Sequence, residues 1–154
     1  MAIVLFDAEG IVYKHLVPNN QTVNGPYYVS VLKNLIDAVR RKRPYLLQRG
    51  CSILHDNAPC HTSNVAQGFL QRNNIEQLTH SPYSPDMAPC DFWLFPNLKI
   101  ALKGKRFQTI DQLDHASGDV LRDLEKNGLL HVFEKWCERM EKCVAHGGGY
   151  VEKE

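Results

Sequence analysis

Two aspartates stand where a carboxylate can do chemistry. Asp56 closely follows residues 51–54, a short apolar run that predicts a buried strand, and ligands commonly bind where strands end at a sheet edge. Asp91 comes after residues 79–89, a loop with three prolines, and opens a helical segment. The two positions differ by 35, so 34 residues separate them. Two carboxylates brought together repel unless a hard cation such as Mg²⁺ or Mn²⁺ lies between them, and that cation can activate a water or a 3′-hydroxyl for phosphoryl transfer.

Each aspartate also has a plainer interpretation. An aspartate at the end of a strand is often a turn residue. Asp91 can simply favour the positive end of the helix that it opens. Spacing alone leaves the metal site and these structural roles open.

Sulfur and imidazole groups near these aspartates raise the alternative of zinc. His55, Cys60, His61 and Cys90 are the residue types that zinc prefers, but the adjacent pair Cys60 and His61 is poor ligand geometry. We favour a supporting role for His55, Asn57 and His61 around a metal at Asp56. The chain has five cysteines without a close CxxC pair, which is typical of free thiols in a reducing compartment.

Basic residues gather after the helical segment that Asp91 opens. Lys99, Lys103, Lys105 and Arg106 are candidates for contacts with DNA phosphates, and a solvated helix end is the alternative. The run at residues 40–43 has the same two interpretations, since cations favour a helix C-terminus. The aromatic residues at 92, 93, 95 and 136 are predicted to be core rather than base-stacking groups.

The elements that must position these residues form an α/β order. Residues 2–6 and 11–17 predict a hairpin whose turn includes Asp7, and a helix follows, capped by Thr22 or Asn24, with apolar residues at three-and-four spacing. Strands at 51–54 and 75–78 flank a helix at about 62–73. Helices near 109–126 and 130–144 follow an interruption near Gly104, and the glycines at 147–149 end the fold. The pattern indicates one α/β domain over residues 1–154.

Bulk composition narrows the class of protein. The chain has 154 residues, 44% of them hydrophobic, which is enough for one domain with a core. No apolar stretch is long enough to span a membrane and no signal segment is visible, so we expect a soluble intracellular protein. The net charge of +1 means that any nucleic-acid surface must be local.

The amino-acid sequence around both aspartates resembles the signature blocks of mariner transposases, a branch of the Tc1/mariner superfamily. Residues 55–61 read HDNAPCH and residues 81–92 read SPYSPDMAPCDF, beside the family patterns HDNAPxH and PYSPDLAPxDxxLF. The 34-residue gap is the spacing of that branch. Residues 4–12, 21–24, 102–107 and 136–144 continue the resemblance, which therefore covers nearly the whole chain. The departures are few: Met87 replaces the usual Leu, and Cys60 and Cys90 stand where small or polar residues are common.

The resemblance implies an RNase H-like fold of the DDE/D transposase and integrase type, with a mixed sheet flanked by helices. It implies Asp56 and Asp91 as the second and third metal carboxylates, and Mg²⁺ or Mn²⁺ as the cofactor for DNA cleavage and strand transfer. DNA, at transposon ends, is the implied partner, with a homodimer as the assembly and the nucleus as the compartment. His55, Asn57 and His61 are expected around the metal, and Lys103, Lys105 and Arg106 on the DNA.

The block that carries the family's first aspartate has no counterpart in this sequence. Asp7 aligns with the family's hairpin turn and does not replace it. We therefore expect an N-terminally truncated catalytic domain without its first strand or the helix-turn-helix region, and little or no cleavage by the chain. The alternatives are a domesticated remnant that binds nucleic acid or a protein partner, and an active nuclease with another third ligand.

Overall fold

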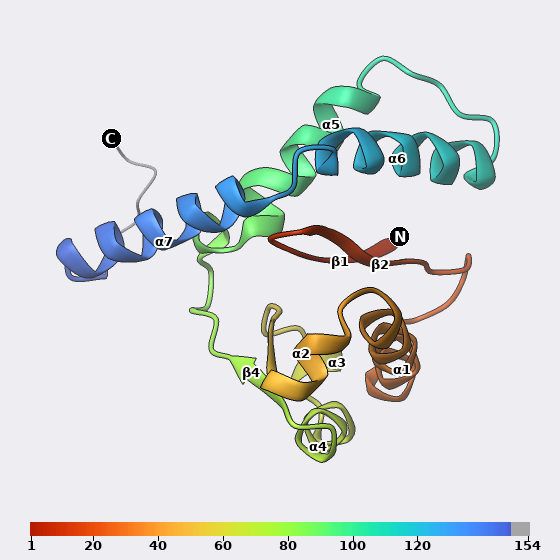
Figure 1. Cartoon of the computed structure of the whole chain (residues 1–154). Helices are drawn as coiled ribbons and strands as arrows, with labels where there is room; N and C mark the ends of the chain where they lie inside the picture. Colours follow the sequence, from red (N-terminus) through yellow and green to blue (C-terminus); the bar gives the residue numbers. More distant parts are fainter. Residues whose placement is uncertain (149–154) are drawn as a thin grey trace. The chain divides into compact units, whose positions relative to one another are not determined.

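The structure is a computed structural model that describes residues 1–148. Its elements, in chain order (Figure 1), are β1 (Ala2–Asp7), β2 (Gly10–Leu16), α1 (Gly25–Lys42), α2 (Pro44–Arg49), β3 (Cys51–Leu54), α3 (Pro59–Thr62), α4 (Asn64–Arg72), β4 (Ile75–Leu78), η1 (Pro85–Met87), η2 (Cys90–Leu94), α5 (Phe95–Leu102), α6 (Ile110–Glu125) and α7 (Leu130–Ala145). Two compact units contain them. Unit 1 comprises residues 1–5 and 12–82, and unit 2 comprises residues 6–11 and the chain from Tyr83 onward. Across the described residues, no helix has the length and apolar character needed to cross a membrane.

The hairpin of β1 and β2 turns at Asp7, as the sequence predicts. The Asp7 side chain accepts hydrogen bonds at Oδ1 from the backbone N–H groups of Glu9, at 2.9 Å, and Gly10, at 3.0 Å. This is the way in which aspartate commonly closes a turn on itself. Asp7 therefore has a local structural role at this position.

Glu125, at the end of α6, explains why position 10 is a glycine. Its Oε2 accepts a hydrogen bond of 2.6 Å from the backbone N–H of Ile11. A Cβ atom at Gly10 would lie 2.7 Å from the same oxygen, and the φ of +142° at Gly10 is strained for other residues. Both constraints are met only without a side chain at this position.

Helix α1 supplies half of the buried residues in the unit 1 core. The Asn24 side chain caps it by accepting a hydrogen bond of 3.0 Å from the Tyr27 backbone N–H, and Pro26 lies in its first turn. The apolar face that the spacing predicts is buried; its members are Tyr28, Val31, Leu32, Leu35, Ile36 and Val39. The predicted helix is thus confirmed, with its basic last turn at residues 40–42.

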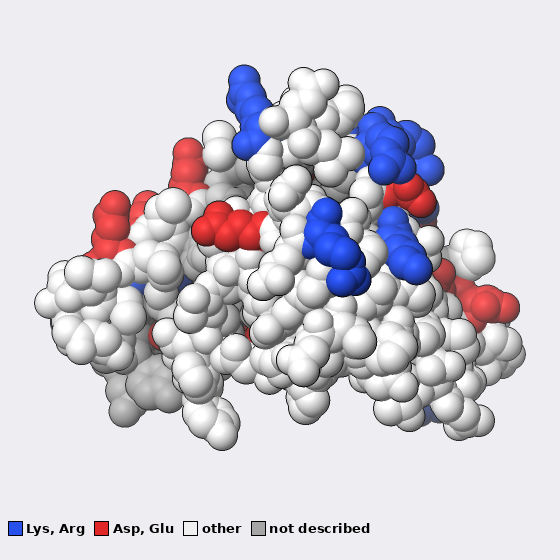
Figure 2. Space-filling model, turned by 90° about the horizontal axis from the view of Figure 1, so that it is seen from below, with Lys and Arg blue, Asp and Glu red and all other residues white. Residues whose placement is uncertain are grey.

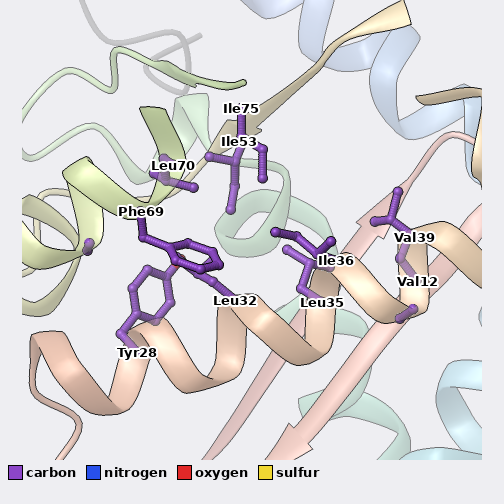
Figure 3. Packing of buried hydrophobic residues seen from close by; sticks show 12 residues of the cluster. Val12, Tyr28, Leu32, Leu35, Ile36, Val39, Ile53, Phe69, Leu70 and Ile75 are labelled. Atoms are coloured by element: carbon purple, nitrogen blue, oxygen red, sulfur yellow. The ribbon is translucent and has the colours of Figure 1, made fainter. Parts of the chain in front are cut away.

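Strands β3 and β4 pair in parallel, in the register Cys51 with Ile75 through Leu54 with Leu78. Parallel strands need a crossover, and α3 and α4 provide it. Figure 3 shows Phe69 and Leu70 of α4 beside Tyr28 and Leu32 of α1, with Ile53 and Ile75 of the two strands packed next to them. Both predicted strands are confirmed. Among the described residues, the strands form two separate two-stranded sheets.

The predicted helix at about 62–73 is confirmed as α4, which begins at Asn64, ends at Arg72 and is preceded by the short helix α3. Ser63 adopts an extended conformation between α3 and α4, with a ψ of 144°. Its hydroxyl accepts a hydrogen bond of 3.4 Å from the Ala66 backbone N–H. A serine cap thus starts a new helix at Asn64.

Unit 2 packs around aromatic residues. The Phe6 ring lies 6.2 Å from Trp93 and 5.9 Å from Phe133, and the Phe133 ring lies 6.2 Å from Trp136. These contacts confirm the prediction that the two tryptophans are packing residues. The same prediction is wrong for Phe95, which is 39% exposed because it starts α5 on a surface shared with Lys99 and Lys103.

Candidate active site

Asp56 lies two residues beyond the end of β3 and presents one carboxylate oxygen for a ligand. Its side chain is 67% exposed. The Nδ1–H of His61 donates to its Oδ1 at 2.7 Å, and the backbone N–H of Ala58 donates to the same oxygen at 3.2 Å. Within residues 1–148 no hydrogen bond is accepted by Oδ2. The carboxylate is therefore anchored through one oxygen while the other is available.

Two histidines of the first signature block stack beside this carboxylate. The imidazole rings of His55 and His61 are parallel, with an interplanar angle of 1° and centroids 4.5 Å apart. The Tyr28 hydroxyl forms a hydrogen bond of 2.8 Å with Nδ1 of His55. The Tyr28 ring also lies 4.3 Å from the His61 ring. Helix α1 and the segment after β3 thus meet at this ring cluster.

Burial shifts the pKa values of His55 and Tyr28. It lowers the pKa of His55 to about 4, with the nearby His61 acting in the same direction. Nε2 of His55 is buried and has no partner in hydrogen-bond geometry. The nearby Gln77 side chain acts in the opposite direction and raises the pKa of His55. Burial also raises the pKa of Tyr28 well above its ordinary value. Both groups are neutral near pH 7.

Asn57 fastens the same segment to the chain after β4. Its Nδ2 donates a hydrogen bond of 2.9 Å to the carbonyl oxygen of His80. The structure thus gives each of the three predicted residues a defined place: His61 bonds Asp56, His55 stacks on His61, and Asn57 bonds His80. Their role around a metal ion stays a prediction. Tyr28 was missed, because its place on the apolar face of a helix predicts a core residue and nothing more.

The zinc alternative can be compared with the side chains of the described residues. No group of three or more His, Cys, Asp or Glu side chains there is arranged to hold a metal ion. Cys60 lies beside Asp56 in unit 1, and Cys90 belongs to unit 2. Burial raises the pKa of the Cys60 thiol, which disfavours the thiolate that zinc requires.

Asp91 is the second residue of η2, in unit 2, and is exposed. Its backbone N–H donates to the Ala88 carbonyl at 2.9 Å, which forms a tight turn. Arg139 of α7 contacts residues before and after this turn. It donates a hydrogen bond of 3.0 Å to the Asp86 carbonyl, and its guanidinium lies 4.3 Å from the centroid of the Phe92 ring. The predicted approach of the Asp56 and Asp91 carboxylates, to within about 4–7 Å, stays a prediction.

The predicted DNA contacts follow α5. Lys103 caps the end of this helix, Gly104 turns the chain with a φ of +79°, and Lys105 and Arg106 follow. All three basic residues are exposed, and none forms an ion pair with another described residue. Figure 2 shows basic side chains as separate projections on a mostly neutral face that also carries acidic groups, in keeping with the net charge of +1.

Comparisons with known proteins place this geometry in a family. The family model "Transposase (partial DDE domain)" matches residues 1–49. The Mariner Mos1 transposase of Drosophila mauritiana is 36% identical over 154 residues, covering 99% of this chain and 45% of its own length. The human histone-lysine N-methyltransferase SETMAR is 29% identical over 160 residues, covering 99% of this chain and 22% of its own length. The chain thus spans less than half the length of these curated relatives.

A solved structure of the Mos1 transposase catalytic domain, with raltegravir and Mn, superposes with a TM-score of 0.92 at 36% identity. The match covers 98% of this chain and 76% of that one. A Mos1 mariner paired-end complex with Mn matches at the same TM-score, covering 98% of this chain and 44% of that one.

The fold is therefore that of an RNase H-like catalytic domain of the DDE class, as the sequence predicts. With two signature blocks, 36% identity and three quarters of a solved catalytic domain covered, this chain belongs to the mariner transposase family.

Proposed function

We propose that this chain forms the metal-binding part of a mariner transposase catalytic domain that acts on DNA, with Asp56 and Asp91 as ligands of Mg²⁺ or Mn²⁺. The observation that carries the proposal is the Asp56 carboxylate, which is anchored at Oδ1 by His61 and Ala58 and open at Oδ2. A carboxylate held in this way enters a metal site with little orientational freedom to lose.

The residues present fit a hard divalent ion. Carboxylate oxygen is the ligand type that Mg²⁺ and Mn²⁺ prefer, and the exposed Asp56 and Asp91 both supply it. Such an ion, when bound, polarises phosphoryl oxygens and activates an attacking water or hydroxyl. Mos1 structures that match this chain were solved with Mn and with Mg.

The surrounding side chains have separate tasks in this proposal. His61 orients the Asp56 carboxylate, and Asn57 keeps the segment against the chain after β4. Arg139 fixes the turn that carries Asp91. The exposed cations Lys103, Lys105 and Arg106 contact phosphates, which supply most of the sequence-independent affinity for DNA.

Isothermal titration of the full chain with Mn²⁺ tests the metal site. Asp56→Asn and Asp91→Asn keep the shape of each side chain and remove its charge, so each should weaken Mn²⁺ binding by about 10-fold or more. Asp119→Asn is the matched control, because Asp119 is an exposed acid paired with Arg122. Equal Mn²⁺ affinity in all three variants and the wild type would contradict the assignment.

The salt dependence of binding to a short duplex of mixed sequence tests the DNA contacts. The triple variant Lys103→Ala/Lys105→Ala/Arg106→Ala should lower the slope of log K against log salt by about 2–3. Arg122→Ala/Lys126→Ala is the control, since both of its cations are in exposed ion pairs. An unchanged slope in the triple variant would remove these residues from the DNA surface.

The resemblance to the family also suggests a homodimer, because two transposon ends must be held at once, and we include it in the proposal. We also propose a nuclear location, because the DNA substrate of a eukaryotic transposase lies there. Light scattering of the purified chain with and without DNA tests the dimer. Microscopy of a fluorescent fusion in eukaryotic cells tests the compartment. A strictly monomeric DNA complex, or a fusion excluded from nuclei, would contradict these two parts.

A further inference from the structure

The buried hydroxyl of Tyr28 is connected to the Asp56 carboxylate through two histidine rings. The Tyr28 side chain is anchored on α1, where the residue is 2% exposed and packs within the apolar cluster of unit 1 (Figure 3). A tyrosine in such a position has one rotamer and a fixed hydroxyl. Its position is therefore set by the core and independent of any ligand.

The first connection is the hydrogen bond of 2.8 Å between the Tyr28 hydroxyl and Nδ1 of His55. A bond to one ring nitrogen holds the imidazole in one orientation and influences which of its nitrogens carries the proton. His55 follows β3 directly, so its backbone is held by the sheet and its ring by Tyr28.

The second connection is ring packing. The His55 and His61 planes are parallel at 4.5 Å, and the Tyr28 ring itself lies 4.3 Å from the His61 ring. His61 thus packs against two aromatic rings, which restricts its rotation. Its Nδ1–H then donates to Asp56 Oδ1 at 2.7 Å.

We propose that Tyr28 is a positioning residue for Asp56: its hydroxyl fixes the His55 ring, which holds His61 in the orientation that aims the second carboxylate oxygen of Asp56 at a divalent cation. The cation in this inference rests on the function proposed above. The ring connections themselves are independent of it.

The neighbouring tyrosine provides a matched control. The Tyr27 hydroxyl also bonds a histidine, Nε2 of His15, at 2.7 Å. It comes from the same turn of α1 and has the same chemistry, but His15 lies in β2 and does not contact Asp56. Tyr27→Phe and Tyr28→Phe therefore remove the same hydroxyl–imidazole bond at two places.

The first measurement is the ¹⁵N NMR spectrum of the imidazole rings of the full chain without metal. Tyr28→Phe should change the tautomer balance of His55 and shift the His61 ring resonances. Tyr27→Phe should change His15 and leave the other two histidines as they are in the wild type. If the His55 and His61 resonances of Tyr28→Phe match those of the wild type, the inference is overturned.

The second measurement is Mn²⁺ affinity. Tyr28→Phe should raise the Mn²⁺ dissociation constant about 10-fold, the size typical for a lost partner of a metal ligand, and Tyr27→Phe should leave it within about twofold. In a double-mutant cycle, Tyr28→Phe should add nothing to His55→Gln, because the hydroxyl acts through that ring. Full additivity would overturn the inference.

Failure of the two proposals would look different. If Asp56→Asn leaves the Mn²⁺ affinity unchanged, the proposed function fails, and the NMR measurement alone decides whether Tyr28 orients the histidines. If Asp56→Asn abolishes binding while Tyr28→Phe behaves like Tyr27→Phe in both measurements, Asp56 is a ligand and Tyr28 is only a core residue.

Discussion

Replacing Arg139 by Met should loosen the turn that carries Asp91. The Arg139 guanidinium donates to the Asp86 carbonyl at 3.0 Å and lies 4.3 Å from the Phe92 ring centroid. A hydrogen bond from a charged group contributes about 1.5–3 kcal/mol, and a cation–π contact about 0.5–2 kcal/mol. We therefore expect Arg139→Met to lower the free energy of unfolding of unit 2 by about 2–5 kcal/mol.

Tryptophan fluorescence during urea denaturation measures this loss selectively. Both tryptophans of the chain, Trp93 and Trp136, belong to unit 2, so their emission reports the unfolding of that unit. With an m-value near 2 kcal/mol/M, the midpoint should fall by about 1 M or more. Hydrogen exchange should rise in residues 83–92, the segment that Arg139 contacts at Asp86 and Phe92.

Arg122→Met is the reference for this experiment. Arg122 forms an exposed ion pair with Asp119, of the kind that contributes about 0–1 kcal/mol, so its midpoint should scarcely move. Arg139→Lys keeps the charge without the planar guanidinium and should fall between the two Met variants. Equal midpoints for Arg139→Met and Arg122→Met would refute the role of Arg139.

Three further predictions concern unit 1. Leu32→Ala, at a fully buried position, should lower the free energy of unfolding by about 2–5 kcal/mol in urea melts followed by circular dichroism, and Leu47→Ala, at a position 37% exposed, should cost less than half as much. Cys51, whose pKa burial raises, should be alkylated later than the exposed Cys137 in timed mass spectrometry; simultaneous labelling would contradict this. In metal-free protein, NMR should show His55 titrating near pH 4. Because the unfolded chain then binds this proton more tightly than the folded one, the free energy of unfolding should fall as the pH drops from about 6.5 through 4. A titration midpoint near 6.5 would contradict the burial of the His55 ring.

Local patterns predicted the elements that local interactions stabilise. The apolar spacing on α1, its cap at Asn24 and the turn at Asp7 all depend on residues a few positions apart, so the sequence contains the whole interaction. The break at Ser63 is also local. The predicted start of this helix, at about residue 62, lies two residues from its observed start at Asn64.

The contacts that position the site are different in kind. Tyr28 and His55 are 27 residues apart, and Arg139 and Asp86 are 53 apart. No periodicity relates such pairs. They meet because α1 packs beside the segment between β3 and α3, and because α7 packs against η1. A tyrosine on an apolar face predicts burial, but the partner of its hydroxyl depends on tertiary structure. The resemblance to the mariner family indicates the aspartates and their neighbours, whereas the contacts of Tyr28 and Arg139 are visible only in the three-dimensional structure.

A crystal structure of the chain grown with Mn²⁺ tests the central claim most directly, because anomalous scattering locates the ion without assumptions about its ligands. The proposal predicts one Mn²⁺ peak within about 2.5 Å of a carboxylate oxygen from both Asp56 and Asp91, with the two carboxylates about 4–7 Å apart. A Mn²⁺ ion bound elsewhere, or the two carboxylates more than about 12 Å apart in the ordered structure, would contradict the claim that these aspartates share a metal site.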